Sequence, residues 1–298
     1  MTPAANPHPD ADRPDADRPD VPPVPAPYLL PFHYGALHHL GVDFLVDPEP
    51  VHKVLAERHP GLTAAEFDGR ACVSVNFQLY FAQYPNGGGV TQEVEVNIVA
   101  RPAAATGLPR FGYAEYARGF DQSKLLGIAR IHVLCDNPLA IDAGTRLYAE
   151  PKYPGWFETV MPSLNGPAHR DAWSVTCRAA GLGPDGGIER REGVLFTLDA
   201  DLAGLRAEPV VSAPVTGYGT DPSGRLLAGP MNVHHPYRLH LLDGAGDHRV
   251  RLEVADGTAP VGRHLTDLLG RTPPAGVWTY QSASVAAHHR AYYVPTRG

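Results

Sequence analysis

The pattern of apolar and polar positions along the chain predicts many strands and few helices. Apolar residues alternate with polar ones, or gather in short β-branched runs, in segments bounded by Gly, Pro, Asn and Asp. One of these segments, 34–46, fits either a strand or a hairpin. The segments expected to be strands are 34–46, 70–84, 90–100, 124–134, 173–179, 193–198, 238–242, 248–254 and 277–288.

Helical signals are short and scattered. Asp47 can cap a helix over 50–59, with Pro48 in its first turn. Aromatic residues recur at helical spacing within 111–120, and 260–269 also has a helical pattern. Because no βαβ unit repeats, the sequence predicts a β-rich α+β fold, a mostly antiparallel sheet or barrel with short peripheral helices.

The first 27 residues differ in composition from the rest. They are rich in Pro, Ala and Asp, contain the repeat DADRPDADRPD and have almost nothing apolar to bury. Such a segment cannot offset the entropy lost on ordering, so residues 1–27 are predicted to be a disordered tail. Residues 28–298 are left for one large domain or two small ones.

Composition narrows the classes of function. The net charge of −7 is spread along the chain without a basic block, which argues against nucleic acid or a membrane surface as a partner. No apolar run approaches the roughly 20 residues that span a bilayer. The three cysteines and fifteen histidines show no metal-ligand spacing, so neither a metal nor a cofactor is predicted. A cytoplasmic enzyme is the simplest interpretation.

The candidate chemistry lies in the stretch from Cys135 to Phe157. Lys152 stands there between Pro151 and a run that contains Tyr153, Trp156 and Phe157. Burial among rings would lower the pKa of this lysine and leave a nucleophilic amine, as Schiff-base chemistry requires. The alternative is a surface lysine in a Pro-rich turn.

The residues around Lys152 resemble the central segment of the acetoacetate decarboxylase-like superfamily. The resemblance is carried by Asp136-Asn137, Ala140-Ile141, Gly144, Arg146, Tyr148 and Pro151-Lys152. In that family the lysine after the proline forms the Schiff base. The resemblance implies a closed β-rich sheet in a single catalytic domain over 28–298, with the lysine in an apolar interior pocket. It also implies a homo-oligomer.

Three positions depart from the family pattern. Tyr153 stands in place of the second lysine, and Leu45 in place of an arginine that binds a carboxylate. The family glutamate that faces the lysine corresponds to Gln92, with Glu93 adjacent. An amide cannot act as a base, so Glu93 is the alternative acid or base, since a register shift of one residue reverses the faces of a strand. The polar pair could also lie on an exposed face.

Other residues complete the predicted site. Arg146 is the candidate for holding a substrate carboxylate, and Tyr148 could donate a hydrogen bond to a bound oxygen. Tyr153 and Trp156 belong to the predicted dry pocket. His132 could move a proton, although a hydrogen-bonded core histidine is the stronger interpretation. Tyr280 is the candidate from the C-terminal part, which closes over the pocket in the family.

All three departures affect the decarboxylation machinery and leave the nucleophile in place. The sequence therefore predicts a Schiff-base lyase for a small keto acid, which performs aldol condensation, dehydration or cyclisation of a pyruvate-like 2-oxo acid. A β-keto acid decarboxylase is the alternative. A noncovalent binding protein or cyclase of the same fold is another, in which Lys152 would be solvated or paired with Glu150 or Glu158.

Overall fold

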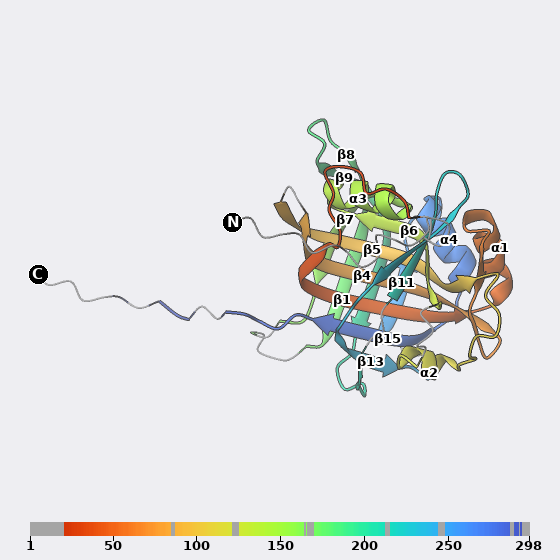
Figure 1. Cartoon of the computed structure of the whole chain (residues 1–298). Coiled ribbons are helices and arrows are strands. Elements are labelled where there is room, and N and C mark those ends of the chain that lie inside the picture. Colours follow the sequence, from red (N-terminus) through yellow and green to blue (C-terminus); the bar gives the residue numbers. More distant parts are fainter. Residues whose placement is uncertain are drawn as a thin grey trace, which may run out of the picture.

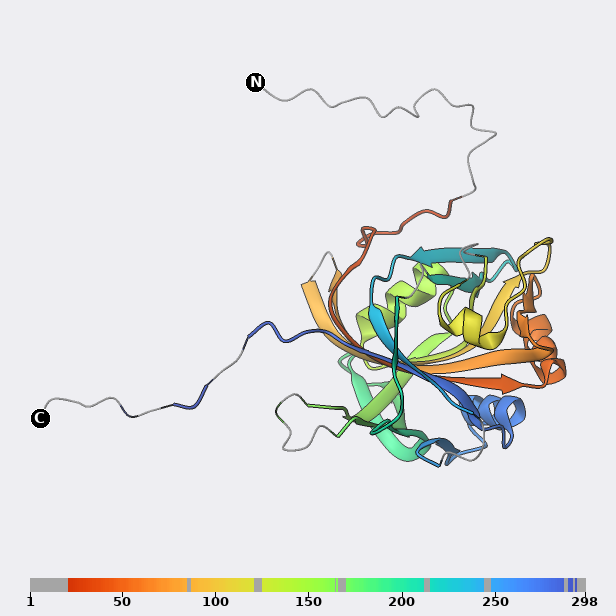
Figure 2. The same cartoon turned by 90° about the horizontal axis from the view of Figure 1, so that it is seen from below.

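Strands make up most of the described part of the chain. The computed structural model describes residues 21–84, 87–120, 125–163, 165, 170–211, 215–243, 248–286, 289–291 and 293. Most of the predicted tail, residues 1–20, lies outside these ranges, and residues 21–27 have no helix or strand. Figure 1 and the turned view in Figure 2 show the strands wrapped around a common interior, and Figure 1 shows the helices at the periphery.

One mixed sheet contains every described strand. Its main path runs β10-β13-β15-β1-β4-β5-β6-β7-β8-β9-β14, and most neighbours are antiparallel. The predicted strand-rich fold is confirmed. Within the described residues the path ends at β10 and β14, so hydrogen bonds do not close the sheet, and β6 makes parallel pairs with β7 and β11. The strands are β1 (His33–Val46), β2 (Leu62–Ala64), β3 (Glu66–Phe67), β4 (Arg70–Tyr84), β5 (Gly87–Pro102), β6 (Gly127–Cys135), β7 (Lys152–Val160), β8 (Ala172–Leu182), β9 (Ile188–Asp201), β10 (Glu208–Val211), β11 (Val215–Thr220), β12 (Leu226–Met231), β13 (Pro236–Leu241), β14 (Val250–Val254) and β15 (Pro274–Gln281).

Four described helices lie among these strands: α1 (Pro48–Arg58), α2 (Tyr113–Ala117), α3 (Pro138–Tyr148) and α4 (Pro260–Leu269). The side chain of Asp47 accepts a hydrogen bond from the Glu49 amide, so the predicted cap of α1 is confirmed. Helix α3 was not predicted. Its signal was present, because Asn137 caps the helix and Pro138 occupies its first turn.

The two faces of the central strands β1, β4, β5 and β6 have opposite chemistry. One face carries the apolar side chains of the main core, which include Val75, Phe77, Val94 and Val96. This face packs against α1, α4 and β7–β9, whose apolar residues belong to the same cluster. The other face carries Ser74, Asn76, Glu93, Glu95 and Asn97, and all of these polar residues are buried.

A β-bulge in β6 decides which of its residues join the polar face. Val96 pairs with His132 but Asn97 pairs with Arg130, so Ile131 is the extra residue. The bulge puts Arg130 on the polar face beside Asn97. It puts His132 on the apolar face beside Val96, because side chains alternate from one residue to the next.

Candidate active site

Lys152 lies on the polar face because the chain turns sharply between α3 and β7. Helix α3 ends at Ala149, which has a left-handed φ of 51°, and β7 then starts at Lys152 beside Val133 of β6. Gly144 of α3 packs directly on this lysine. A Cβ atom at Gly144 would lie 2.8 Å from the Lys152 Cδ atom and would also clash with the Glu150 carboxylate. Glycine at this position therefore makes room for the lysine side chain.

The Lys152 ammonium group is buried against carboxylates. Its Nζ atom lies 2.6 Å from Glu93 Oε2 and 3.4 Å from Glu150 Oε2, and only 6% of the Lys152 side chain is exposed. The Tyr80 hydroxyl donates a hydrogen bond of 3.0 Å to Glu93 Oε2. Glu93 is thus the side chain of β5 that faces the lysine, and Gln92 is not.

These carboxylates reverse the predicted pKa shift of Lys152. Burial alone would lower the pKa of Lys152, but Glu93 and Glu150 outweigh it and hold the pKa well above its ordinary value. Burial raises the pKa of Glu93 to about 7, although the Lys152 ammonium acts to lower it. The prediction of a lysine left uncharged by surrounding rings was therefore wrong, because it took no account of carboxylates on the neighbouring strand.

A second ion pair lies two residues further along β5, at Glu95. Arg130 Nε donates to Glu95 Oε1 at 2.9 Å, and Arg130 Nη1 lies 3.5 Å from Glu150 Oε1. The Asn97 amide donates to Glu95 Oε2 at 2.8 Å. Burial acts to raise the pKa of Glu95, but Arg130 and Asn97 outweigh it and lower the pKa to about 2. Glu95 is therefore held ionised.

Two amides of β4 connect the ion pairs. Gln78 Nε2 donates to Glu93 Oε1 at 3.5 Å and to Asn76 Oδ1 at 3.3 Å, and Asn76 Nδ2 donates to Glu95 Oε2 at 3.4 Å. Because these bonds are long, they are weaker than the ion pairs. Glu150 joins the two cations on the other side, so Lys152 and Arg130 belong to one buried network.

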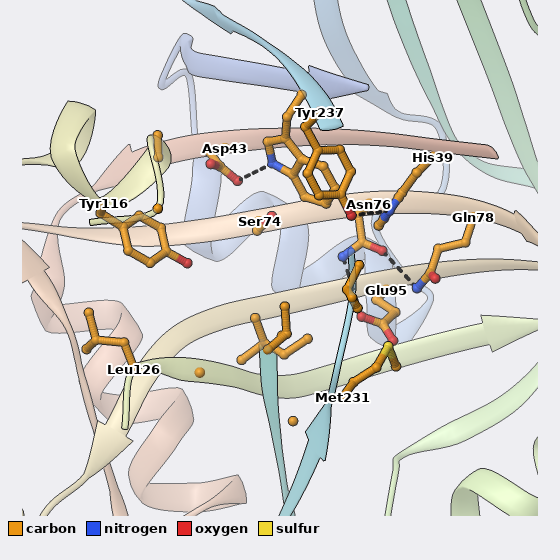
Figure 3. Close-up of a pocket in the computed structure, with 18 of the residues that line it drawn as sticks. His39, Asp43, Ser74, Asn76, Gln78, Glu95, Tyr116, Leu126, Met231 and Tyr237 are labelled. Atoms are coloured by element: carbon orange, nitrogen blue, oxygen red, sulfur yellow. Dashed lines mark hydrogen bonds between the residues drawn. The ribbon is translucent and has the colours of Figure 1, made fainter. Parts of the chain in front are cut away.

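A cavity of about 230 Å³ opens on this polar face (Figure 3). Gln78, Asn76, Glu95 and Arg130 supply one polar wall, and His39 lies beside them. Lys152 and Glu93 are not among the lining residues. Gln78 lines the cavity and also contacts Glu93, so it lies between the cavity and the Lys152–Glu93 pair.

Three predicted site residues lie on the opposite face of the strands. Gln92 donates from Nε2 to Asp136 Oδ2 at 3.1 Å and does not face the lysine. His132 has Nδ1 2.9 Å from the Tyr153 hydroxyl and Nε2 2.7 Å from His264 Nδ1. Strand alternation and the β6 bulge separate these side chains from Lys152.

Four other predicted residues also lie away from the cavity lining. Arg146 is 42% exposed and pairs with Asp142 at 3.3 Å, one turn earlier in α3. Trp156 is 37% exposed, and Tyr280 stacks on His235. Tyr148 packs with its ring close to Gly229 of β12. The predicted aromatic pocket around the lysine was thus wrong, and the tyrosine that reaches its partner Glu93 is Tyr80 of β4.

Five residues of the network and the cavity wall were not predicted from the sequence: His39, Asn76, Gln78, Glu95 and Arg130. For three of them, Asn76, Gln78 and Glu95, a signal existed. Strand 70–84 alternates as S-V-N-F-Q-L-Y over 74–80, and strand 90–100 as E-V-E-V-N over 93–97. Polar side chains at every second position of strands this apolar are typical of a buried polar face that holds a site.

Two negative findings apply to the described part of the chain. It contains no group of three His, Cys, Asp or Glu side chains placed to hold a metal ion. None of its helices is long and apolar enough to cross a membrane.

Comparison with known proteins supports the fold. No protein-family model matches the chain, and neither does any curated protein sequence. Among solved structures, the enduracididine biosynthesis enzyme MppR, in complex with the condensation product of pyruvate and imidazole 4-carboxaldehyde, matches with a TM-score of 0.53 and 13% identity over 84% of each chain. MppR in complex with pyruvate matches with a TM-score of 0.51 and 13% identity, over 84% of this chain and 86% of that one.

A weaker likeness joins the chain to an acetoacetate decarboxylase-like enzyme from Sphingomonas wittichii RW1, with a TM-score of 0.48 and 15% identity over 83% of this chain and 88% of that one. At such low identities the likeness to MppR shows a shared fold. The strand-rich fold expected from the sequence is thus shared with MppR.

Proposed function

We propose that the protein is a Schiff-base lyase that acts on a small keto acid through Lys152. The observation that carries this proposal is the buried contact of 2.6 Å between Lys152 Nζ and Glu93, next to a cavity. Burial raises the pKa of Glu93 to about 7, so this carboxylate can take up a proton near neutral pH. The pair therefore supplies both a nucleophile and a base.

The proposed reaction starts with a proton transfer within this pair. The Lys152 ammonium gives one proton to Glu93, and the nitrogen lone pair of the free amine then attacks the substrate carbonyl carbon. The proton that the attacking nitrogen now carries in excess moves to the carbonyl oxygen and gives a neutral carbinolamine. Glu93 then gives its proton to the carbinolamine hydroxyl, which leaves as water, and a protonated imine and the Glu93 carboxylate remain. The imine carries the charge that the ammonium carried, so Glu150, 3.4 Å from Nζ, favours both states.

The surroundings of Lys152 favour aldol condensation, dehydration or cyclisation over decarboxylation. The residue after Lys152 adds no second cation, because it is Tyr153, which lies on the other face of β7 with its hydroxyl on His132. The neighbour of Lys152 is instead Glu93, a base that can remove a proton from the carbon next to the imine. That proton transfer begins a condensation or an elimination, and decarboxylation does not need it.

Arg130 replaces Arg146 as the proposed partner of a substrate carboxylate. Arg130 lines the cavity, whereas Arg146 pairs with Asp142 on α3. A bound carboxylate shares Arg130 with Glu95 and Glu150, since both lie within 3.5 Å of the guanidinium. The cytoplasmic location, the homo-oligomer and the single domain over 28–298 stay predictions.

Reductive trapping tests the proposal. The chain has only three lysines, Lys53, Lys124 and Lys152, so an adduct is easily located by peptide mass. Borohydride with pyruvate or acetoacetate should add the corresponding mass to Lys152, and Lys152→Ala should abolish the adduct. Lys53→Ala is the matched control, because Lys53 is exposed on α1. An unchanged adduct in Lys152→Ala would contradict the proposal.

One observation favours a second candidate function, noncovalent binding. The 2.6 Å ion pair holds the Lys152 ammonium, and Lys152 does not line the cavity. This arrangement was expected of a binding protein, with Glu150 rather than Glu158 as a partner. In that case Lys152→Arg should keep ligand affinity, and no keto acid of a test panel should be trapped.

A further inference from the structure

The cavity extends along the strands well beyond the position of Lys152. Gln78 pairs with Glu93 on one side and His39 on the other, and Ser74 pairs with Asp43. The two rows are four residues apart, about 13 Å at 3.3 Å per residue. Residues of both rows line the cavity, and Figure 3 shows Asp43 and Gln78 toward opposite ends. Pyruvate spans roughly 4 Å, so the cavity suits a longer molecule.

Asp43 is a buried carboxylate at the far end without a cationic partner. It is 5% exposed, and its oxygens accept hydrogen bonds from the Tyr113 hydroxyl at 3.0 Å and from Trp278 Nε1 at 3.4 Å. Among the described residues, no lysine or arginine forms an ion pair with it. Burial raises the pKa of Asp43, although hydrogen bonds from Ser74, Tyr113 and Trp278 act to lower it.

The opposite end offers groups for a ligand oxygen. His39 is 7% exposed, and its Nε2 atom is buried without a hydrogen-bond partner, while Nδ1 lies 3.1 Å from the Tyr237 hydroxyl. Arg130 also lines the cavity; its backbone lies in the row of Ser74, and its guanidinium reaches Glu95, one row nearer to Gln78. Between the two ends the wall includes the Trp278 ring, which lies over Gly41, and Leu239 beside it, with Asn76 and Glu95 on the polar side.

We propose that the cavity binds an elongated molecule with an ammonium or similar cation at Asp43, a middle that packs on Trp278 and Leu239, and an oxygen-bearing group at Gln78 and His39. The inference rests on the proposed function in one respect, that the oxygen-bearing end holds the carbonyl that Lys152 attacks.

The preference for a cation follows from electrostatics. A carboxylate has about four acceptor positions, and three donors reach Asp43, so a position remains for a ligand donor. Glu95 and Arg130 neutralise each other in the opposite wall. Asp43 is therefore the uncompensated acidic group of the cavity, and a buried charge gains most from an opposite charge.

Calorimetric titration of the Lys152→Ala variant tests this inference without Schiff-base chemistry. The probes are straight ω-aminocarboxylates from 5-aminopentanoate to 9-aminononanoate, each compared with the carboxylate that lacks the amine. We expect the ammonium to tighten binding roughly tenfold or more, with the best affinity at an intermediate length. Asp43→Asn should remove this preference, and Arg146→Ala, outside the cavity, should keep it.

The outcomes separate this inference from the proposed function. Equal affinity for amine-bearing and amine-free probes would overturn the inference, as would a preference that persists in Asp43→Asn. If Asp43→Asn does not fold, the matched probes still decide, because the Lys152→Ala protein with native Asp43 must prefer the ammonium. A failure to trap an adduct on Lys152 concerns only the proposed function.

Discussion

Two glutamates on one face of β5 have opposite electrostatic behaviour. Glu93 and Glu95 are both buried and each contacts one cation, Lys152 at 2.6 Å and Arg130 at 2.9 Å. Yet the pKa of Glu93 is raised by burial to about 7, whereas Arg130 and Asn97 lower that of Glu95 to about 2. Arginine cannot give up its proton in a protein, and lysine can. The Glu95 pair is therefore suited to hold the structure, and the Glu93 pair to exchange a proton.

The largest difference between the two pairs should appear in the free energy of unfolding when each cation is replaced. Arg130→Met leaves Glu95 buried without its partner and should cost about 3–5 kcal/mol of unfolding free energy. Lys152→Met should cost less, about 1–2 kcal/mol, because Glu93 can take up a proton and become neutral. Urea unfolding at pH 7 measures both, and equal losses would show that the two pairs are equivalent.

Replacement of the proposed base should affect activity next. Below pH 7 Glu93 is protonated and cannot accept the Lys152 proton, so kcat/KM should fall about tenfold per pH unit there and level off above pH 7. Glu93→Gln should lower kcat/KM by about a hundredfold and remove this pH dependence. Steady-state kinetics over pH 5–9 with the keto acid that traps on Lys152 provide the check. An unchanged profile would exclude Glu93 as the base.

The two glutamates should also change stability in opposite pH ranges. The folded pKa of Glu93 lies above its unfolded value, so its contribution is full below pH 4.5 and is lost as the pH rises through about 7. The folded pKa of Glu95 lies below its unfolded value, so its contribution is present above pH 4.5 and is lost toward pH 2. Each of these contributions is worth about 3 kcal/mol.

Thermal and urea unfolding over pH 2–9 should show this difference. Glu93→Gln should remove the loss between about pH 4.5 and 7, and Glu95→Gln should weaken the loss below pH 4.5. A Glu93→Gln variant that still loses stability as the pH rises to 7 would assign that loss to another group.

Arg146 provides the smallest expected effect. It is exposed and pairs with Asp142 on the same helix, so Arg146→Ala should cost at most about 0.5 kcal/mol. The KM for a keto acid should stay within about twofold, because Arg130 and not Arg146 lines the cavity. A large rise in KM would restore Arg146 as the carboxylate-binding group.

The fold was more predictable than the site because it depends on local patterns. Alternation in 70–84 gave β4 with its observed bounds, and the apolar spacing of 260–269 gave α4. Helix α3 was not predicted because its residues were interpreted only as a chemical motif. The cap residue Asn137 and Pro138 in the first turn, which are typical of the start of a helix, were not considered. Strand β7 was missed for a similar reason, since the aromatic run after Lys152 was interpreted as the wall of a pocket.

The site depends on contacts between distant strands, which no local pattern contains. The position of Lys152 could be predicted, but the face of β5 that meets it could not, because one residue of register decides between Gln92 and Glu93. The bulge at Ile131 had no sequence signal that we can identify, and it alone separates Arg130 from His132. The carboxylates that reverse the pKa shift of Lys152 come partly from a strand some 60 residues away in sequence.

The most direct test of the central claim is an NMR titration of the glutamate side-chain carboxyl carbons in the intact protein. The account predicts one carboxyl carbon that titrates near pH 7 and is lost in Glu93→Gln, and another that stays ionised down to about pH 2 and is lost in Glu95→Gln. If both residues titrate at the ordinary value near 4.5, the Lys152–Glu93 pair is not a proton-exchanging pair and the proposed mechanism is contradicted.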